Sequence, residues 1–233
     1  MRIASWNCNG ALRKKLGALC TLDADIYVVQ ECEDPARSTD ANYKDWAANY
    51  LWLGPTKNKG LAVFAKPEIS LKQVDLDAGP LELFLPCIVN DDTALLAAWT
   101  RQANSPNFRY IGQLWKYLQA HAGFLKTEKA MLIGDLNSNT CWDEWDRWWN
   151  HSDVVSDLKV LGLESCYHRG FNEEQGKETR PTFFMYRKPE KPYHIDYAFL
   201  SQALLPNAKL EIGDIDTWLE HSDHMPVVVD ISG

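Results

Sequence analysis

The sequence lacks the features that mark zinc-binding, disulfide-stapled and membrane-spanning proteins. Its six cysteines form no Cys-x-x-Cys pair, so neither a zinc site nor a disulfide framework is indicated. No apolar run approaches the roughly 20 residues that cross a bilayer, and no signal peptide is recognisable. We therefore expect a soluble, cytoplasmic protein with reduced thiols and no membrane partner.

Long linkers, internal repeats and low-complexity runs are also missing. With 233 residues, of which 45% are hydrophobic, the chain can bury a large core, and we expect one domain over residues 1–233. The formal net charge of −8 excludes a protein that coats nucleic acid by bulk electrostatics. It is compatible with a nuclease, because part of the charge can belong to a site that holds a cation.

Basic residues are few but gather near segments that carry polar motifs. They are Arg13-Lys14-Lys15, then Lys57 and Lys59, and finally Arg187-Lys188 with Lys191. Each cluster is equally consistent with a grip on substrate phosphates and with an ordinary solvated surface.

Polar side chains stand where predicted strands begin or end. Asn7 ends an N-terminal strand, Glu31 ends the apolar run that starts at Asp25, and Asp223 with His224 precede Val227-Val228-Val229. A run of valines requires burial, so the polar pair before it belongs at the rim of a sheet. Rims and loops are where functional sites are built.

Two further strands bring four more polar residues. Asp135 and Asn137 follow the apolar run from Lys129 to Ile133, and strand alternation predicts that both face one pocket. Likewise, His194 and Asp196 open a strand and share one face. Because antiparallel neighbours place one strand's end beside another's start, we expect all of these strand termini to converge on one edge.

Five short motifs then occur in a recognisable order: Trp6-Asn7-Cys8-Asn9-Gly10, Gln30-Glu31, Gly134-Asp135-Leu136-Asn137, Ile195-Asp196-Tyr197 and Ser222-Asp223-His224. Together they resemble the endonuclease/exonuclease/phosphatase superfamily, which includes proteins similar to exonuclease III, abasic-site endonucleases and DNase I-type nucleases. The resemblance covers Met1 to Ile231. It implies a DNase I-like α/β fold: a two-layered sandwich of mixed, mainly antiparallel β-sheets flanked by helices, with the site at one rim.

The resemblance also implies cleavage of a phosphoester with a divalent metal, and the residue types suit that chemistry. Mg²⁺ prefers carboxylate and amide oxygens, and Mn²⁺ accepts the same donors. We expect Glu31 as the principal ligand, Asn7 contributing its amide oxygen and Asp223 close by. Asn7 as a helix cap and Glu31 as a solvated strand end are the structural alternatives.

Four residues match the family's catalytic positions. Asp135 corresponds to the general base that activates water, and Asn137 is an uncharged donor that can hold the phosphate. His224 paired with Asp196 would supply an oriented, cationic imidazole beside the developing negative charge. For His194, to which the family assigns no role, we favour a buried structural histidine.

One position departs from the family pattern. A Tyr or His usually ends a middle strand and contacts the phosphate, but the segment Thr93–Arg101 offers Trp99 there. An indole donates a hydrogen bond but cannot act as an acid. Arg101 or Tyr110 would then take over the phosphate contact, and Arg101 suits it better because guanidinium binds phosphate in a bidentate manner.

Periodicity predicts helices over Leu12–Cys20 and Phe108–His121, a helical or irregular stretch over Asp143–Leu158, and strands over Leu61–Ala65 and Leu83–Val89. If residues 141–150 are helical, Trp142, Trp145 and Trp149 share one face. Such a stripe either stacks on unpaired bases or packs in the core or at a partner interface, and we favour packing.

The sequence therefore predicts a divalent-metal-dependent phosphodiesterase, favouring a nuclease that hydrolyses DNA. One alternative is a phosphatase acting on a phosphoinositide or another small phosphoester, since fold and motifs do not separate these substrates. The absence of a polybasic or lipid-facing loop disfavours a phosphoinositide. The other alternative is a catalytically weak binding or effector protein that retains the fold.

Overall fold

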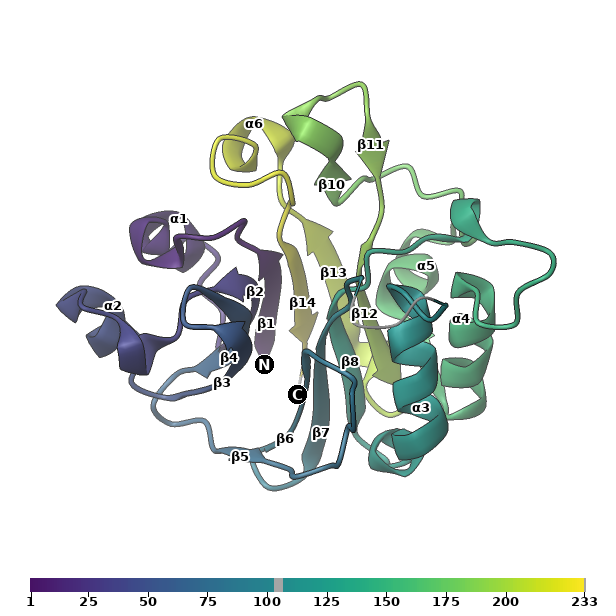
Figure 1. The fold of residues 1–233 in the computed structure, drawn as a ribbon, viewed down its shortest axis with the longest axis horizontal. Coiled ribbons are helices and arrows are strands. Elements are labelled where there is room, and N and C mark those ends of the chain that lie inside the picture. Colours follow the sequence, from purple (N-terminus) through teal and green to yellow (C-terminus); the bar gives the residue numbers. More distant parts are fainter. Residues whose placement is uncertain (103–106, 233) are drawn as a thin grey trace.

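Two six-stranded β-sheets pack face to face, and helices cover their outer surfaces in the computed structural model (Figure 1), which describes residues 1–102 and 107–232. The expected sandwich of mixed sheets flanked by helices is confirmed. Among the described residues, no helix is long and apolar enough to cross a membrane.

The first sheet has the strand order β13-β14-β1-β2-β4-β3. Its strands are β1 (Arg2–Asn7), β2 (Ile26–Cys32), β3 (Tyr50–Thr56), β4 (Lys59–Ala65), β13 (Ala208–Ile212) and β14 (Val227–Ile231). Only β1 and β2 run parallel within it, and the other neighbours are antiparallel.

The second sheet has the order β5-β6-β7-β8-β12-β9 and again one parallel pair, β7 with β8. Its strands are β5 (Leu71–Gln73), β6 (Phe84–Val89), β7 (Thr93–Trp99), β8 (Ala130–Asp135), β9 (Leu163–Ser165) and β12 (Asp196–Ser201). A two-stranded ribbon, β10 (Phe183–Phe184) with β11 (Pro192–Tyr193), stands apart from both sheets.

Six α-helices and five short 3₁₀ turns complete the described chain. The helices are α1 (Leu16–Cys20), α2 (Ala41–Trp46), α3 (Ile111–Leu125), α4 (His151–Val160), α5 (Cys166–Phe171) and α6 (Ile215–Trp218). The 3₁₀ turns are η1 (Leu12–Lys14), η2 (Pro35–Arg37), η3 (Thr140–Trp142), η4 (Met185–Arg187) and η5 (Leu205–Asn207).

Alternation along the strands divides the apolar residues between an inner core and two outer cores. In the first sheet Ile3 and Val28 face the second sheet, whereas Ala4 and Val29 belong to an outer core covered by α1, α2 and α6. The outer face of the second sheet packs against α3 and α4, as Figure 1 shows on its right side. Both faces of the central strands are buried, which explains their near-continuous apolar sequences.

The predicted elements are present with shifted bounds. The Leu12–Cys20 helix is split into η1 and α1, the helix expected from Phe108 begins at Ile111, and the two predicted strands correspond to β4 and β6. The stretch from Asp143 becomes helical only at His151.

The tryptophan segment contradicts the helical stripe. Trp142 ends a 3₁₀ turn, and Trp145 and Trp149 lie outside any helix. Local hydrogen bonds explain the difference: Asn150 Oδ1 accepts from the Glu144 amide at 2.9 Å, and Arg147 Nη2 donates to the Trp142 carbonyl at 2.7 Å. Such side-chain bonds compete with helix formation. Packing in the core is also wrong for Trp145, whose exposed fraction is 97%.

Candidate active site

Seven of the predicted site residues meet at one rim of the sandwich. Asn7 and Glu31 come from the parallel pair β1–β2, Asp135 ends β8, Asp196 starts the antiparallel neighbour β12, and His224 precedes β14. In register, Asp196 lies opposite Asp135. The expected convergence of strand ends and strand starts is therefore what the topology produces, with Asn137 and Asp223 on the adjoining loops.

Glu31 sits on a β-bulge. The register between β2 and β4 shifts between Gln30 and Cys32, and Glu31 adopts the left-handed φ of 63°. Bulges re-aim a side chain at the edge of a site, and a non-glycine residue in this conformation is uncommon. The backbone is therefore bent at Glu31, the residue that the family resemblance suggests as the principal metal ligand.

Asp135 and Asn137 reach the same pocket by a different route from the one predicted. The strand ends at Asp135, so simple alternation does not apply, and Asn137 has a left-handed φ of 44°. The turn brings the Asn137 side chain back toward Asp135, so that Asn137 Nδ2 donates to Asp135 Oδ2 at 2.9 Å. Gly134 makes this possible, since its φ is 152° and a Cβ there would lie 1.8 Å from the Ala98 carbonyl oxygen.

The Asp135 carboxylate is fully buried. It accepts three hydrogen bonds: from Asn7 Nδ2 at 2.9 Å, from Asn137 Nδ2 at 2.9 Å and from the Asn137 amide at 2.8 Å. A carboxylate offers about four lone-pair sites, so one acceptor position remains. The two asparagines therefore fix the direction in which Asp135 can still accept a proton.

His224 is held between two carboxylates. Its Nδ1 lies 2.9 Å from Asp196 Oδ2, and its Nε2 lies 3.9 Å from Asp135 Oδ2. The Thr182 hydroxyl holds the Asp196 side of this pair, accepting from the amides of Ile195 and Asp196, both at 3.0 Å. The Met225 amide donates to the Thr182 carbonyl at 2.7 Å, so Thr182 ties both members of the pair together.

The electrostatics of these three groups are coupled. Burial raises the pKa of Asp135, with His224 opposing and Asp196 adding to the rise. Burial alone would lower the pKa of His224, but attraction to Asp196 and then Asp135 outweighs it and raises that pKa to about 9. At neutral pH the imidazole is cationic, and a carboxyl with a raised pKa is better matched to proton transfer.

Asp223 lies next to the N-terminal motif. Its Oδ1 accepts from Asn9 Nδ2 at 3.0 Å, and the neighbouring Ser222 hydroxyl donates to the Asn7 carbonyl at 2.7 Å. Asn7 in turn directs its Nδ2 toward Asp135 and, at 3.4 Å, toward Glu31, while its Oδ1 accepts from the Asn9 amide. That oxygen keeps a second lone pair.

The three residues expected to contact substrate are placed less uniformly. Trp99 lies opposite Asp135 in register but is only 5% exposed. Arg101 pairs with Glu82 at 3.3 Å, so its charge is already partly offset. Tyr110 is 41% exposed at the start of α3.

Two residues of the site carried no sequence signal. Thr182 joins segments far apart in the chain by accepting from backbone amides, and Phe183 places its ring 4.6 Å from the His224 ring. Ser222 belongs to a predicted motif but had no predicted role, and its hydroxyl donates to the Asn7 carbonyl. Lys59, whose ammonium lies 2.7 Å from Glu31 Oε2, was visible only as one member of a basic cluster. His194 is buried as expected, and its Nδ1 contacts the Arg180 carbonyl at 2.8 Å.

Two groups of side chains have the donor types of a metal site. Asp135, Asp196 and His224 each offer a ligand atom within 4.8 Å of the others. As a metal ligand the His224 imidazole would have to be neutral, whereas its two carboxylate neighbours raise its pKa and favour the protonated ring. The other group, Glu31 with Asn7 and Asp223, carries the carboxylate and amide oxygens that a hard cation prefers, although Asn7 turns its Nδ2 toward Glu31 and its Oδ1 toward the Asn9 amide.

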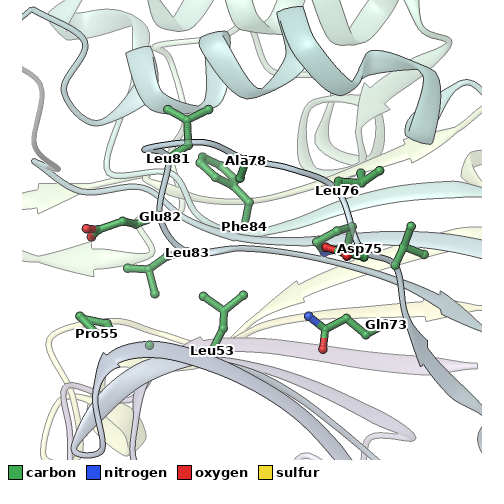
Figure 2. A pocket seen from close by; sticks show the side chains of 13 residues that line it. Leu53, Pro55, Gln73, Asp75, Leu76, Ala78, Leu81, Glu82, Leu83 and Phe84 are labelled. Atoms are coloured by element: carbon green, nitrogen blue, oxygen red, sulfur yellow. The ribbon is translucent and has the colours of Figure 1, made fainter.

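A separate cavity of about 380 Å³ lies between the edges of the two sheets. Figure 2 shows Pro55 and Glu82 at one end and Gln73 toward the other, with Leu53, Leu83 and Phe84 between them. None of the predicted site residues lines it. The predicted site residues therefore lie at the strand-end rim and not in this cavity.

Residues 4–224 match the model of the Endonuclease/Exonuclease/phosphatase family, and the chain belongs to that family. Its members are nucleases and other phosphoesterases, so the chain belongs to a family of phosphoester hydrolases. A search of curated proteins gives no significant match.

Solved structures with the same fold include a phosphatase bound to DNA, an exonuclease and an AP endonuclease. The chain is similar to the 3′ phosphatase NExo from Neisseria bound to a product DNA hairpin, with a TM-score of 0.72 and 19% identity over 100% of both chains. It is also similar to the 3′-5′ exonuclease NExo from Neisseria meningitidis (TM-score 0.71, 21% identity) and to an AP endonuclease from Archaeoglobus fulgidus (0.71, 18%), again with 100% of both chains covered.

Proposed function

We propose that the protein is a divalent-metal-dependent phosphodiesterase that hydrolyses DNA in the cytoplasm. The observation that carries this proposal is the continuous set of contacts from Glu31 through Asn7 and Asp135 to His224 and Asp196. It combines a hard-cation site, a buried carboxylate and a cationic imidazole at one rim. A 3′ phosphatase bound to a product DNA hairpin, a 3′-5′ exonuclease structure of the similarly named NExo and an AP endonuclease among the structural neighbours support the choice of DNA.

Glu31 and Asp223 would hold Mg²⁺ or Mn²⁺ through carboxylate oxygens, and Asn7 through its amide oxygen, because these are the donors that hard cations prefer. Asn7 would have to turn its side-chain amide to do so, since its Nδ2 faces Glu31. When bound, the cation neutralises phosphate charge and stabilises the leaving oxygen. The remaining donors act directly on the substrate. Asn137 is uncharged and would not repel a phosphate oxygen, but its Nδ2 already donates to Asp135 and to the Thr100 carbonyl, so it would have to release one of them to donate to the phosphate. The cationic His224 stabilises negative charge that develops in the transition state.

Asp135 is the group placed to accept a proton from the attacking water. Asn7 and Asn137 leave it one acceptor position, and its raised pKa increases its basicity. Asp196 keeps His224 charged and fixes which face of the imidazole points into the site. These roles account for each of the four predicted catalytic residues.

The test is a substrate panel: duplex, single-stranded and abasic DNA, RNA, and inositol phosphates, each with Mg²⁺, Mn²⁺ or EDTA. We expect metal-dependent release of nucleotides or nicked strands from at least one DNA substrate. Turnover of inositol phosphates alone would establish a phosphatase instead. Binding of DNA without turnover under any metal condition would establish an effector protein that keeps the fold.

A further inference from the structure

Lys59 opens β4 and places its ammonium on the carboxylate that is expected to bind metal. Lys59 Nζ lies 2.7 Å from Glu31 Oε2, and the Lys59 side chain is 49% exposed while that of Glu31 is 17% exposed. The pair is therefore reachable from solvent but anchored on its carboxylate side. The Lys59 ammonium is therefore the cation that pairs with the Glu31 carboxylate.

The backbone keeps Lys59 at this position. Gly60 lies opposite Cys32, just past the bulge at Glu31. A Cβ on Gly60 would meet the Trp52 ring at 2.4 Å and the Leu53 carbonyl oxygen at 2.5 Å, so the hairpin packs at a distance that only glycine permits. The close packing fixes the root of the Lys59 side chain, while its four-carbon stem stays free to reorient.

Trp99 is a second neighbour of Lys59. Its ring has Lys59 Nζ 5.9 Å from the centroid and the Arg101 guanidinium carbon also at 5.9 Å. The indole thus adjoins two cations, which is a function that a Tyr or His at this strand end would perform less well, because Trp gives the strongest cation–π attraction. Arg101 has Glu82 as partner, whereas the partner of Lys59 is a residue that a divalent cation needs.

We propose that, in the free protein, Lys59 pairs with Glu31 where a divalent cation would otherwise bind. Once the cation binds the Glu31 carboxylate, Lys59 is released and binds the substrate phosphate. The inference rests on the proposed function and specifies how the same site is loaded. A divalent cation and an ammonium compete for Glu31 because both interact with its oxygens. Released from Glu31, Lys59 remains beside Trp99 and is a point-charge ligand for phosphate.

The proposal requires two effects of opposite sign from one substitution. Lys59→Met, which keeps chain length without charge, removes the competitor and should tighten Mn²⁺ binding about three- to fivefold, the weight of one partly exposed ion pair. The same variant should weaken binding of a duplex oligonucleotide, measured with Ca²⁺ present, by a similar factor. Lys57→Met is the matched control, since Lys57 is an exposed neighbour on the same hairpin, and should change neither value.

Mn²⁺ binding is measured by calorimetry on the protein alone, so this result is independent of any catalytic activity. Unchanged or weaker Mn²⁺ binding in Lys59→Met would refute the competition between Lys59 and the cation for Glu31. Unchanged oligonucleotide binding would refute the contact between Lys59 and the substrate phosphate. If Lys59→Met melts at a lower temperature than the wild type, Lys59→Gln replaces it under the same criteria. Failure of the proposed function would appear separately, as absent turnover in a wild type that still shows the Mn²⁺ effect.

Discussion

Replacing Asp196 by Asn should change how protein stability depends on pH. Asp196 is the first of the groups that raise the pKa of His224, which goes from 6.5 to about 9. One pKa unit corresponds to about 1.4 kcal/mol, so the preference of the folded state for the imidazolium is worth about 3 kcal/mol. His224 is 5% exposed, so solvent screening does not remove this contribution.

The sign follows from the direction of the shift. A group whose pKa is raised by folding stabilises the protein fully below its unfolded pKa, and this stabilisation is lost as the pH rises through the folded value. The wild type should therefore lose up to about 3 kcal/mol of unfolding free energy between pH 6.5 and 9. In Asp196→Asn the His224 pKa falls, because burial then opposes a smaller attraction, and the loss should shrink to less than about half.

Urea unfolding at several pH values between 6 and 9.5, with EDTA present, measures this difference, and an NMR titration of the His224 ring gives its pKa directly. Activity that depends on the imidazolium should fall as the pH rises toward 9 in the wild type, and at lower pH in the variant. Parallel stability curves for the two proteins would refute the assignment of the charge to the Asp196–His224 pair.

Three further substitutions test other parts of the site and fold. Glu31→Gln should weaken Mn²⁺ binding and lower turnover by orders of magnitude at an unchanged melting temperature, and full activity of this variant in EDTA would falsify its ligand role. Asp135→Asn should abolish turnover but preserve or tighten substrate binding in an anisotropy assay, since it removes a negative charge near the phosphate; loss of both in a folded protein would make Asp135 a structural or metal residue. Trp145→Ala should change the unfolding free energy by less than about 0.5 kcal/mol because the side chain is 97% exposed, while a loss of about 1–3 kcal/mol in affinity for single-stranded DNA would show stacking on bases.

The sequence was sufficient to place the strand-end residues, because a polar group after a buried strand has few other positions available. Asn7, Glu31, Asp135 and His224 were each marked by an apolar run that stops at or beside them. Their convergence also followed from general rules of sheet topology. The family resemblance supplied the order of the motifs and hence the fold.

Other features depend on contacts that periodicity does not encode. Thr182 joins Asp196 to the segment before β14 through hydrogen bonds to its side chain and backbone, and nothing in its neighbours signals that role. The helix predicted for the tryptophan segment is wrong because Asn150 stabilises a loop there. Its Oδ1 accepts hydrogen bonds from the Glu144 backbone amide and from Arg147 Nε. The tryptophans do have helical spacing in the sequence, but local polar contacts determine the backbone conformation.

The position of β1 has a consequence for the order of folding. β1 lies between β2 and β14, and the Met1 ammonium donates to the Ile231 carbonyl at 2.8 Å. During synthesis the edge of β1 that pairs with β14 stays unpaired until residues near 227 have left the ribosome. Contacts between residues so far apart in the sequence form slowly. His224 arrives with that same strand. The candidate site is therefore completed last, so a truncated or half-made chain would carry Glu31 and Asp135 but lack the His224 imidazole.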